Sequence, residues 1–92
     1  MEQQDFYKKL KQSLEETTAF PSKYMFKFIV PSKDDKVAQI ENMFNHLGAV
    51  IQTKPSSTGK YESITIVANM DSADAIIEKY KEVSAVEGVI SL

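Results

Sequence analysis

The chain has 92 residues, of which 42% are hydrophobic and 26% are charged, and its formal net charge is −2. A chain of this size folds as one domain with a single thin core, and this composition is typical of a folded domain. All eleven basic residues are lysines. Because arginine is the usual ligand for phosphate and guanine, the lack of arginine and the negative charge disfavour a nucleic-acid partner.

Cysteine is absent, which excludes disulfide bonds, thiolate metal sites and a cysteine nucleophile. No apolar run approaches the ~20 residues that span a membrane. The first five residues are polar and acidic, unlike the basic and apolar start of a signal peptide. We therefore expect a cytoplasmic protein without membrane contact.

The first predicted element is an amphipathic helix over residues 4–17. Phe6, Tyr7, Leu10 and Leu14 recur there at helical spacing, with lysines and glutamates between them. The segment that ends in Pro21 breaks this pattern, because proline disfavours helical geometry in the residue before it.

Residues 22–30 predict a strand, because aromatic and β-branched side chains alternate along them. One face would carry Tyr24, Phe26, Phe28 and Val30, and the other Lys23, Met25, Lys27 and Ile29. Apolar residues on both faces are typical of a central strand.

A second helix is predicted from residue 36, with an apolar stripe that runs from Val37 to Leu47. Ser32, Asp34 or Asp35 would cap its start, and Gly48 fits a left-handed residue at its end. Residues 49–54 then predict a short strand at a sheet edge, since a proline follows at position 55.

Residues 61–70 predict the second long strand, because they are rich in β-branched residues. Asp71 is expected to cap a third helix over residues 73–83, with Asp74 in its first turn. A turn at Gly88 leads into a last strand over residues 89–92.

This order of elements predicts an α+β fold, a ferredoxin-like (βαββαβ) sandwich with a four-stranded antiparallel sheet and an extra N-terminal helix. Residues 1–92 would form one domain, with residues 1–21 as the helix and lead-in and residues 22–92 as the core. The first and third strands would be the central pair, which agrees with their length and apolar character.

The N-terminal helix is not needed by such a sandwich. We expect it to pack within the chain, either across the open sheet face over Met25, Ile29, Ile64 and Ile66 or beside the helical layer. Cover within the chain is favoured over docking of its apolar stripe onto a second copy or another protein. If the helix leaves the sheet face, that face becomes a binding surface.

The chain resembles the YbeD-like family of small bacterial proteins of unknown function. The resemblance covers about residues 10–92 and rests on Phe20-Pro21, Tyr24 and residues 26–30, together with the hairpin pattern K-P-S-S-x-G-x-Y-x-S over residues 54–63. It implies a ferredoxin-like fold close to that of ACT regulatory domains. It also implies a regulatory, ligand-binding or partner-binding role, with no established reaction and no catalytic residues.

The hairpin offers the candidate ligand-binding residues: Lys54, Ser56, Ser57, Thr58, Gly59 and Lys60. Their hydroxyls, backbone N–H groups and lysines would suit a phosphate or a carboxylate in a small nest. The favoured alternative is a plain turn in which Gly59 takes a positive φ and the serines satisfy local backbone groups.

The sequence lacks a nucleophile–base–orienter set, and His46 is its only histidine. We therefore predict a non-enzymatic regulatory or interaction module that binds a protein partner or a small effector, without metal or cofactor. One alternative is an anion- or metabolite-binding, even catalytic, domain that uses the hairpin. A second is an RRM-like RNA binder with Tyr24, Phe26 and Phe28 as stacking residues, although the second long strand lacks the RRM pattern. Edge pairing through residues 89–92 would give a homodimer.

Overall fold

The computed structural model describes residues 2–91, except for the side chains of residues 2–4 and 46. Its elements in chain order are α1 (Glu2–Thr17), β1 (Ser22–Pro31), α2 (Lys36–Phe44), the 3₁₀ helix η1 (Asn45–Leu47), β2 (Val50–Pro55), β3 (Tyr61–Met70), α3 (Ala73–Ser84) and β4 (Ile90–Ser91). Leu92, which the sequence places at the end of the last strand, lies outside the described residues.

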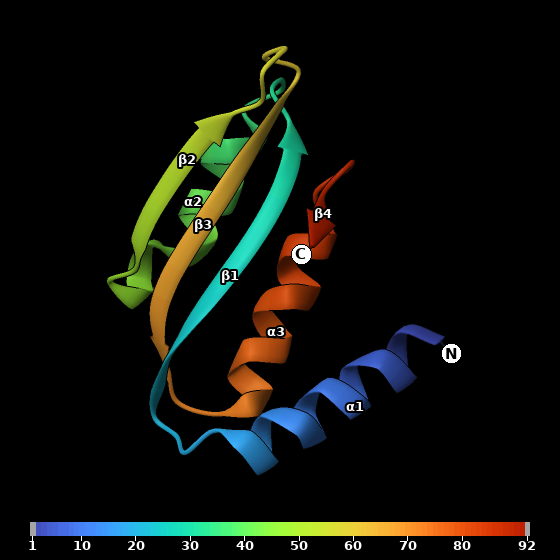
Figure 1. Cartoon of the computed structure of the whole chain (residues 1–92), viewed down its shortest axis with the longest axis vertical. Coiled ribbons are helices and arrows are strands. Elements are labelled where there is room, and N and C mark those ends of the chain that lie inside the picture. Colours follow the sequence, from blue (N-terminus) through green and yellow to red (C-terminus); the bar gives the residue numbers. More distant parts are fainter. Residues whose placement is uncertain (1, 92) are drawn as a thin grey trace.

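The four strands form one antiparallel sheet in the order β2-β3-β1-β4. The two long strands, β1 and β3, are the central pair, and ten residues of each are paired from Ser22↔Met70 to Pro31↔Tyr61. Helices α2 and α3 lie on one side of the sheet (Figure 1). The predicted ferredoxin-like sandwich with an extra N-terminal helix is therefore confirmed.

The core lies between the sheet and the helices α2 and α3. Cross-strand pairing joins Phe26 to Ile66 and Phe28 to Ile64, and all four side chains are fully buried. Phe44 of α2 packs on Phe26 with 5.0 Å between ring centroids. The expectation that Ile64 and Ile66 face the open side of the sheet is wrong, because directly paired residues of antiparallel strands share a face.

Helix α1 packs against α3 and does not cross the sheet (Figure 1). Lys11 Nζ lies 3.0 Å from the Asp74 carboxylate, and the hydrogen bond to Asp74, followed by its charge, raises the pKa of Lys11. Lys81 Nζ lies 5.5 Å from the centre of the Tyr7 ring, and Leu14 is buried. Of the alternatives for this helix, packing beside the helical layer is therefore correct.

Two of the predicted helix caps are wrong, and one is confirmed. Asp35 precedes α2 with a left-handed φ of 54°, and its side chain makes no capping hydrogen bond. Ser72, not Asp71, caps α3, since its Oγ accepts a hydrogen bond from the backbone N–H of Ala75 at 3.1 Å. Gly48 has the expected left-handed conformation, with φ 62°, although it follows η1, since α2 itself ends at Phe44.

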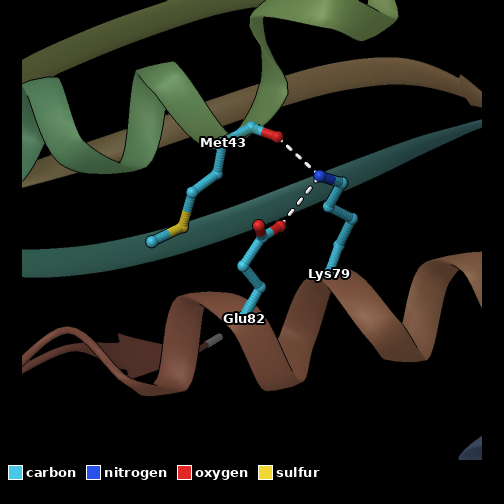
Figure 2. A network of polar contacts seen from close by, with 3 residues as sticks. All are labelled: Met43, Lys79 and Glu82. Carbon is cyan, nitrogen blue, oxygen red and sulfur yellow. Dashed lines mark hydrogen bonds and ion pairs between the residues drawn. The ribbon is translucent and has the colours of Figure 1, made fainter.

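Lys79 ties α3 to the end of α2. Its Nζ donates hydrogen bonds to the backbone oxygen of Met43, at 2.6 Å, and to Glu82 Oε1, at 2.8 Å. Both contacts are drawn in Figure 2. The Met43 carbonyl belongs to the last turn of α2, where a cation is favoured because the final carbonyl groups of a helix lack intrahelical partners. The ammonium group thereby joins the two helices that cover the sheet.

Replacing Lys79 by methionine keeps most of the aliphatic side chain but removes the charged donor. We expect Lys79→Met to lower the free energy of unfolding by about 2 kcal/mol, because it leaves a helix-end carbonyl without a charged partner. Glu82→Ala removes only the ion pair to a half-exposed glutamate and should cost roughly 0.5 kcal/mol or less. Urea denaturation of both variants measures the difference, and equal losses would contradict this role of Lys79.

A second polar link joins the sheet to α3. The hydroxyl oxygens of Tyr24, on β1, and Tyr80, on α3, lie 2.8 Å apart. Burial, and then the hydrogen bond to Tyr24, raises the pKa of Tyr80 above its ordinary value of 10.0. The folded state therefore favours the neutral phenol of Tyr80.

This raised pKa predicts a pH dependence at high pH. The stabilisation by neutral Tyr80 is complete below the unfolded value of 10.0 and is lost as the pH rises above it. The difference in unfolding free energy between the parent and Tyr80→Phe should therefore be constant from pH 7 to 9 and shrink above about pH 10. Denaturation curves of both proteins over this range test it, with Tyr61→Phe as a control for loss of an exposed phenol. A difference that stays unchanged up to pH 11 would refute the prediction.

Candidate functional site: the open face of the sheet

The sheet has one face that the helices leave uncovered, which we call the open face. The register of the strands assigns its side chains, because residues alternate between the two faces and paired residues share one. Its members are Lys23, Met25, Lys27, Ile29, Pro31, Val50, Gln52, Lys54, Tyr61, Ser63, Thr65, Val67, Asn69 and Ile90. All of these side chains are at least partly exposed.

Side chains of directly paired residues form rows that run across the strands. Three of these rows contain one residue each of β1, β2 and β3. The apolar row consists of Met25, Val67 and Val50. The polar row beside it consists of Lys27, Thr65 and Gln52. The mixed row consists of Ile90, Ile29, Ser63 and Lys54. Successive rows are two residues apart along each strand, or about 7 Å.

The mixed row borders an apolar hollow of about 350 Å³. Its lining includes the apolar side chains of Ile29, Ile90 and Pro55 and the ring of Tyr61. Tyr61 and Ile90 are each about half exposed, at 46% and 51%. The apolar row lines a second, smaller hollow of about 280 Å³, where Met25 and Val50 are 55% and 63% exposed.

The polar row lies between these two hollows and borders a third, whose lining is mostly polar. Lys27 and Lys54 converge there on one hollow of about 560 Å³, together with Gln52 and Thr65. Lys23 lies on the same face of β1, beyond Met25, and is exposed. The described register positions of the open face thus hold three lysines and no acidic side chain, although the whole chain has a net charge of −2.

The predicted hairpin residues are divided between this face and the tip of the turn. Lys54 and Ser56 line the apolar hollow. Ser57, Thr58, Gly59 and Lys60 lie beyond the sheet in the connection between β2 and β3 and are exposed. Of the predicted hairpin residues, the structure therefore brings only Lys54 and Ser56 together with the residues of the open face.

Local hydrogen bonds occupy much of the polar capacity of the turn. The backbone N–H of Gly59 donates to the Ser56 carbonyl at 3.0 Å, and the backbone N–H of Tyr61 donates to Ser56 Oγ at 3.2 Å. Thr58 Oγ1 accepts from the backbone N–H of Lys60 at 3.5 Å. Gly59 has φ 75°. These contacts are those of the plain turn, with a conformation that favours glycine.

Gly59 provides a direct test of that description. A Cβ atom added there would meet nothing within 4 Å, so a substitution costs only backbone strain at positive φ. We expect Gly59→Ala to lower the unfolding free energy by about 1 kcal/mol, and Gly59→Asn by less, since asparagine tolerates the left-handed region. Thermal or urea denaturation compares the two variants. Equal stability of the parent and Gly59→Ala would contradict the strain.

The aromatic residues proposed as RNA-stacking groups face the helices instead of the open face. Phe26 and Phe28 are fully buried, and the Tyr24 ring packs edge-on against Tyr80 with 6.3 Å between ring centroids. Tyr61 is the one aromatic side chain at the described positions of the open face. An RRM-like surface needs aromatic side chains on the exposed face of both central strands, and this sheet buries those of β1.

Acidic residues gather elsewhere, around the start of α2. Asp34, Asp35, Glu41 and Glu62 line a hollow of about 340 Å³ together with two lysines. Over the side chains that the structure describes, no group of three His, Cys, Asp or Glu residues is arranged to hold a metal ion. His46 lies in η1, and its side chain is outside the described part. No helix within residues 2–91 is long and apolar enough to cross a membrane.

Sequence reasoning missed most of the open face. It identified Met25 and Ile29 as residues of that face but did not connect them with Gln52, Thr65 or Val67. The signal was available in the alternation along residues 50–54 and 61–67. Only the cross-strand register shows which of the two alternating sets is exposed.

Comparisons with known proteins identify relatives of this chain. The family described as "Protein of unknown function (DUF493)" matches residues 15–92. A UPF0250 protein from Shewanella halifaxensis (strain HAW-EB4) is 32% identical over 78 residues, which cover 82% of this chain and 89% of that protein. No solved structure matches the chain. The resemblance to the YbeD-like family is thereby confirmed.

Proposed function

The chain belongs to the DUF493 family of proteins of unknown function, and we propose that it is a non-enzymatic interaction module that binds a protein partner on the open face of its sheet. The fold leaves this face without cover, since α1, α2 and α3 all lie on the helical side (Figure 1). The partner would supply the layer that a sheet normally packs against.

The exposed apolar side chains carry this proposal. The described residues expose five large hydrophobic side chains, and four of them, Met25, Val50, Tyr61 and Ile90, lie on the open face. The fifth is Phe6 on α1. Single exposed hydrophobic residues are common on protein surfaces, but a group of them on one face, rimmed by polar side chains, is typical of a protein interface.

The shape and chemistry of the face support binding of a protein rather than catalysis or capture of a small molecule. A small ligand is usually enclosed by its pocket, whereas these hollows lie side by side along one sheet face. Its described positions hold no histidine, cysteine or acidic side chain that would serve as a nucleophile or general base near neutral pH. Ser63 Oγ donates to the Lys54 carbonyl at 3.3 Å.

The homodimer predicted through the last strand stays a prediction. β4 comprises only Ile90 and Ser91, which pair with Ile29 and Phe28 of β1. Beyond these two residues, β4 contributes no further pairs along the edge of β1 within residues 2–91.

A photo-crosslinking amino acid at Gln52 tests the proposed function in the source cell. Gln52 is exposed and borders two of the hollows. We expect irradiation to yield a discrete covalent adduct with another protein. The matched control places the same amino acid at Glu78, an exposed position of α3 on the helical side, where no such adduct should form.

Two results would contradict the proposal. One is the absence of a protein adduct at Gln52, or adducts of equal yield at Gln52 and Glu78. The other is that a metabolite raises the melting temperature of the parent but not that of Ser57→Ala or Lys60→Ala. This result would identify the hairpin as the binding site.

A further inference from the structure

No ion pair of the described residues involves the three lysines of the open face. Lys23, Lys27 and Lys54 are exposed, and the ion pairs of the described residues involve Lys11 and Lys79 instead. The acidic residues of this chain occupy other positions, so its charge is separated between the open face and the remaining surface. A surface of one sign attracts a partner of the opposite sign and repels others.

The order of the rows adds a spatial pattern to this charge. The apolar row and the mixed row, with its Ile29 and Ile90, are about 13 Å apart because four strand residues separate them. The polar row with Lys27 lies midway between them. A helix aligned with the strands places residues i, i+4 and i+8 on one side at intervals of about 6 Å. Apolar, acidic and apolar side chains at those positions would match the three rows in turn.

A helix fits this face better than an extended segment. Side chains, not backbone groups, form the surface of a sheet face, so an extended peptide lying on it would lose water from its N–H and C=O groups without gaining partners. A helix satisfies those groups internally. The apolar hollows can then receive its side chains without burying unpaired polar groups of its backbone.

A second copy of this chain fits the face poorly. Packing two open faces together would bring Lys23, Lys27 and Lys54 of both copies into one interface with no acidic side chain at the described positions to offset them. Like charges that face each other across an interface disfavour binding.

From these observations we propose that the partner docks an acidic amphipathic helix on the open face, with its acidic side chains between two groups of apolar ones, opposite Lys27 and Lys54. This inference rests on the proposed function and specifies its partner. The apolar hollows around Ile29 and Met25 receive the apolar side chains of the helix, and the lysines select its charge.

Charge reversal on the open face tests the inference. The cross-link at Gln52 is repeated in Lys27→Glu/Lys54→Glu, and its yield should fall at least about tenfold, since attraction becomes repulsion. Lys27→Gln/Lys54→Gln should give an intermediate loss. Lys9→Glu/Lys33→Glu changes two exposed lysines outside the sheet and should leave the yield unchanged. Equal melting temperatures of the purified variants show that each one folds.

A second measurement needs only the parent protein. Mass spectrometry of the Gln52 adduct identifies the partner segment, and a synthetic peptide of that segment is titrated against the parent chain. We expect the peptide to be net acidic and to gain helical circular dichroism on binding. A version with glutamine in place of its acidic residues should bind at least about tenfold more weakly, and raising the salt from 50 to 500 mM should weaken the acidic peptide far more than the neutral one.

The outcomes separate this inference from the proposed function. Three results would overturn the acidic helix but leave a protein-binding face. They are an adduct at Gln52 that persists in Lys27→Glu/Lys54→Glu, a mapped partner segment without net negative charge, and an adduct with a second copy of the chain. The absence of any protein adduct in the parent removes both proposals.

Discussion

The antiparallel pairing of β1 with β3 determines the rest of this structure. It extends over ten residues of each strand, from Ser22↔Met70 to Pro31↔Tyr61. A shift of one residue in either strand would exchange its buried and exposed side chains, because the side-chain period of a strand is two. Phe26 and Phe28 would face water after a shift of β1, and Ile64 and Ile66 after a shift of β3. The register therefore fixes the core and, by the same alternation, the composition of the open face.

The helical side of the sheet is closed by contacts that differ in kind. Hydrophobic burial around Phe26 and Phe44 supplies the core. Directional polar contacts then set the positions of the helices. Lys79 donates a hydrogen bond to the Met43 carbonyl, and the hydroxyl groups of Tyr80 and Tyr24 are hydrogen-bonded to each other. Because α1 joins this side through Lys11 and Leu14, all three helices gather there. The uncovered face is thus a consequence of where α1 finds its partners.

The open face combines two features that a sheet in solution usually avoids together. It exposes apolar side chains such as Met25 and Val50, and the charges at its described positions are all of one sign. Either a helix of the chain or a partner with the opposite charge would resolve this. Since α1 lies elsewhere, we infer a partner, and the lysines of the open face favour an acidic one. The hairpin, by contrast, satisfies much of its own polar capacity in a local turn.

The sequence by itself determined the elements and their order, because alternation and helical spacing are local signals. Residues 61–70 were predicted with the bounds of β3, and Gly48 and Gly59 with their positive φ. Local signals also placed Phe26 and Phe28 on one face of their strand and Lys27 on the other. They placed Ile64 and Ile66 on the wrong face and left the position of α1 open. Tertiary structure decided both. The pairing with a neighbouring strand determines which side chains of a strand face the core. Helix α1 packs where it can both bury Leu14 and form the ion pair between Lys11 and Asp74.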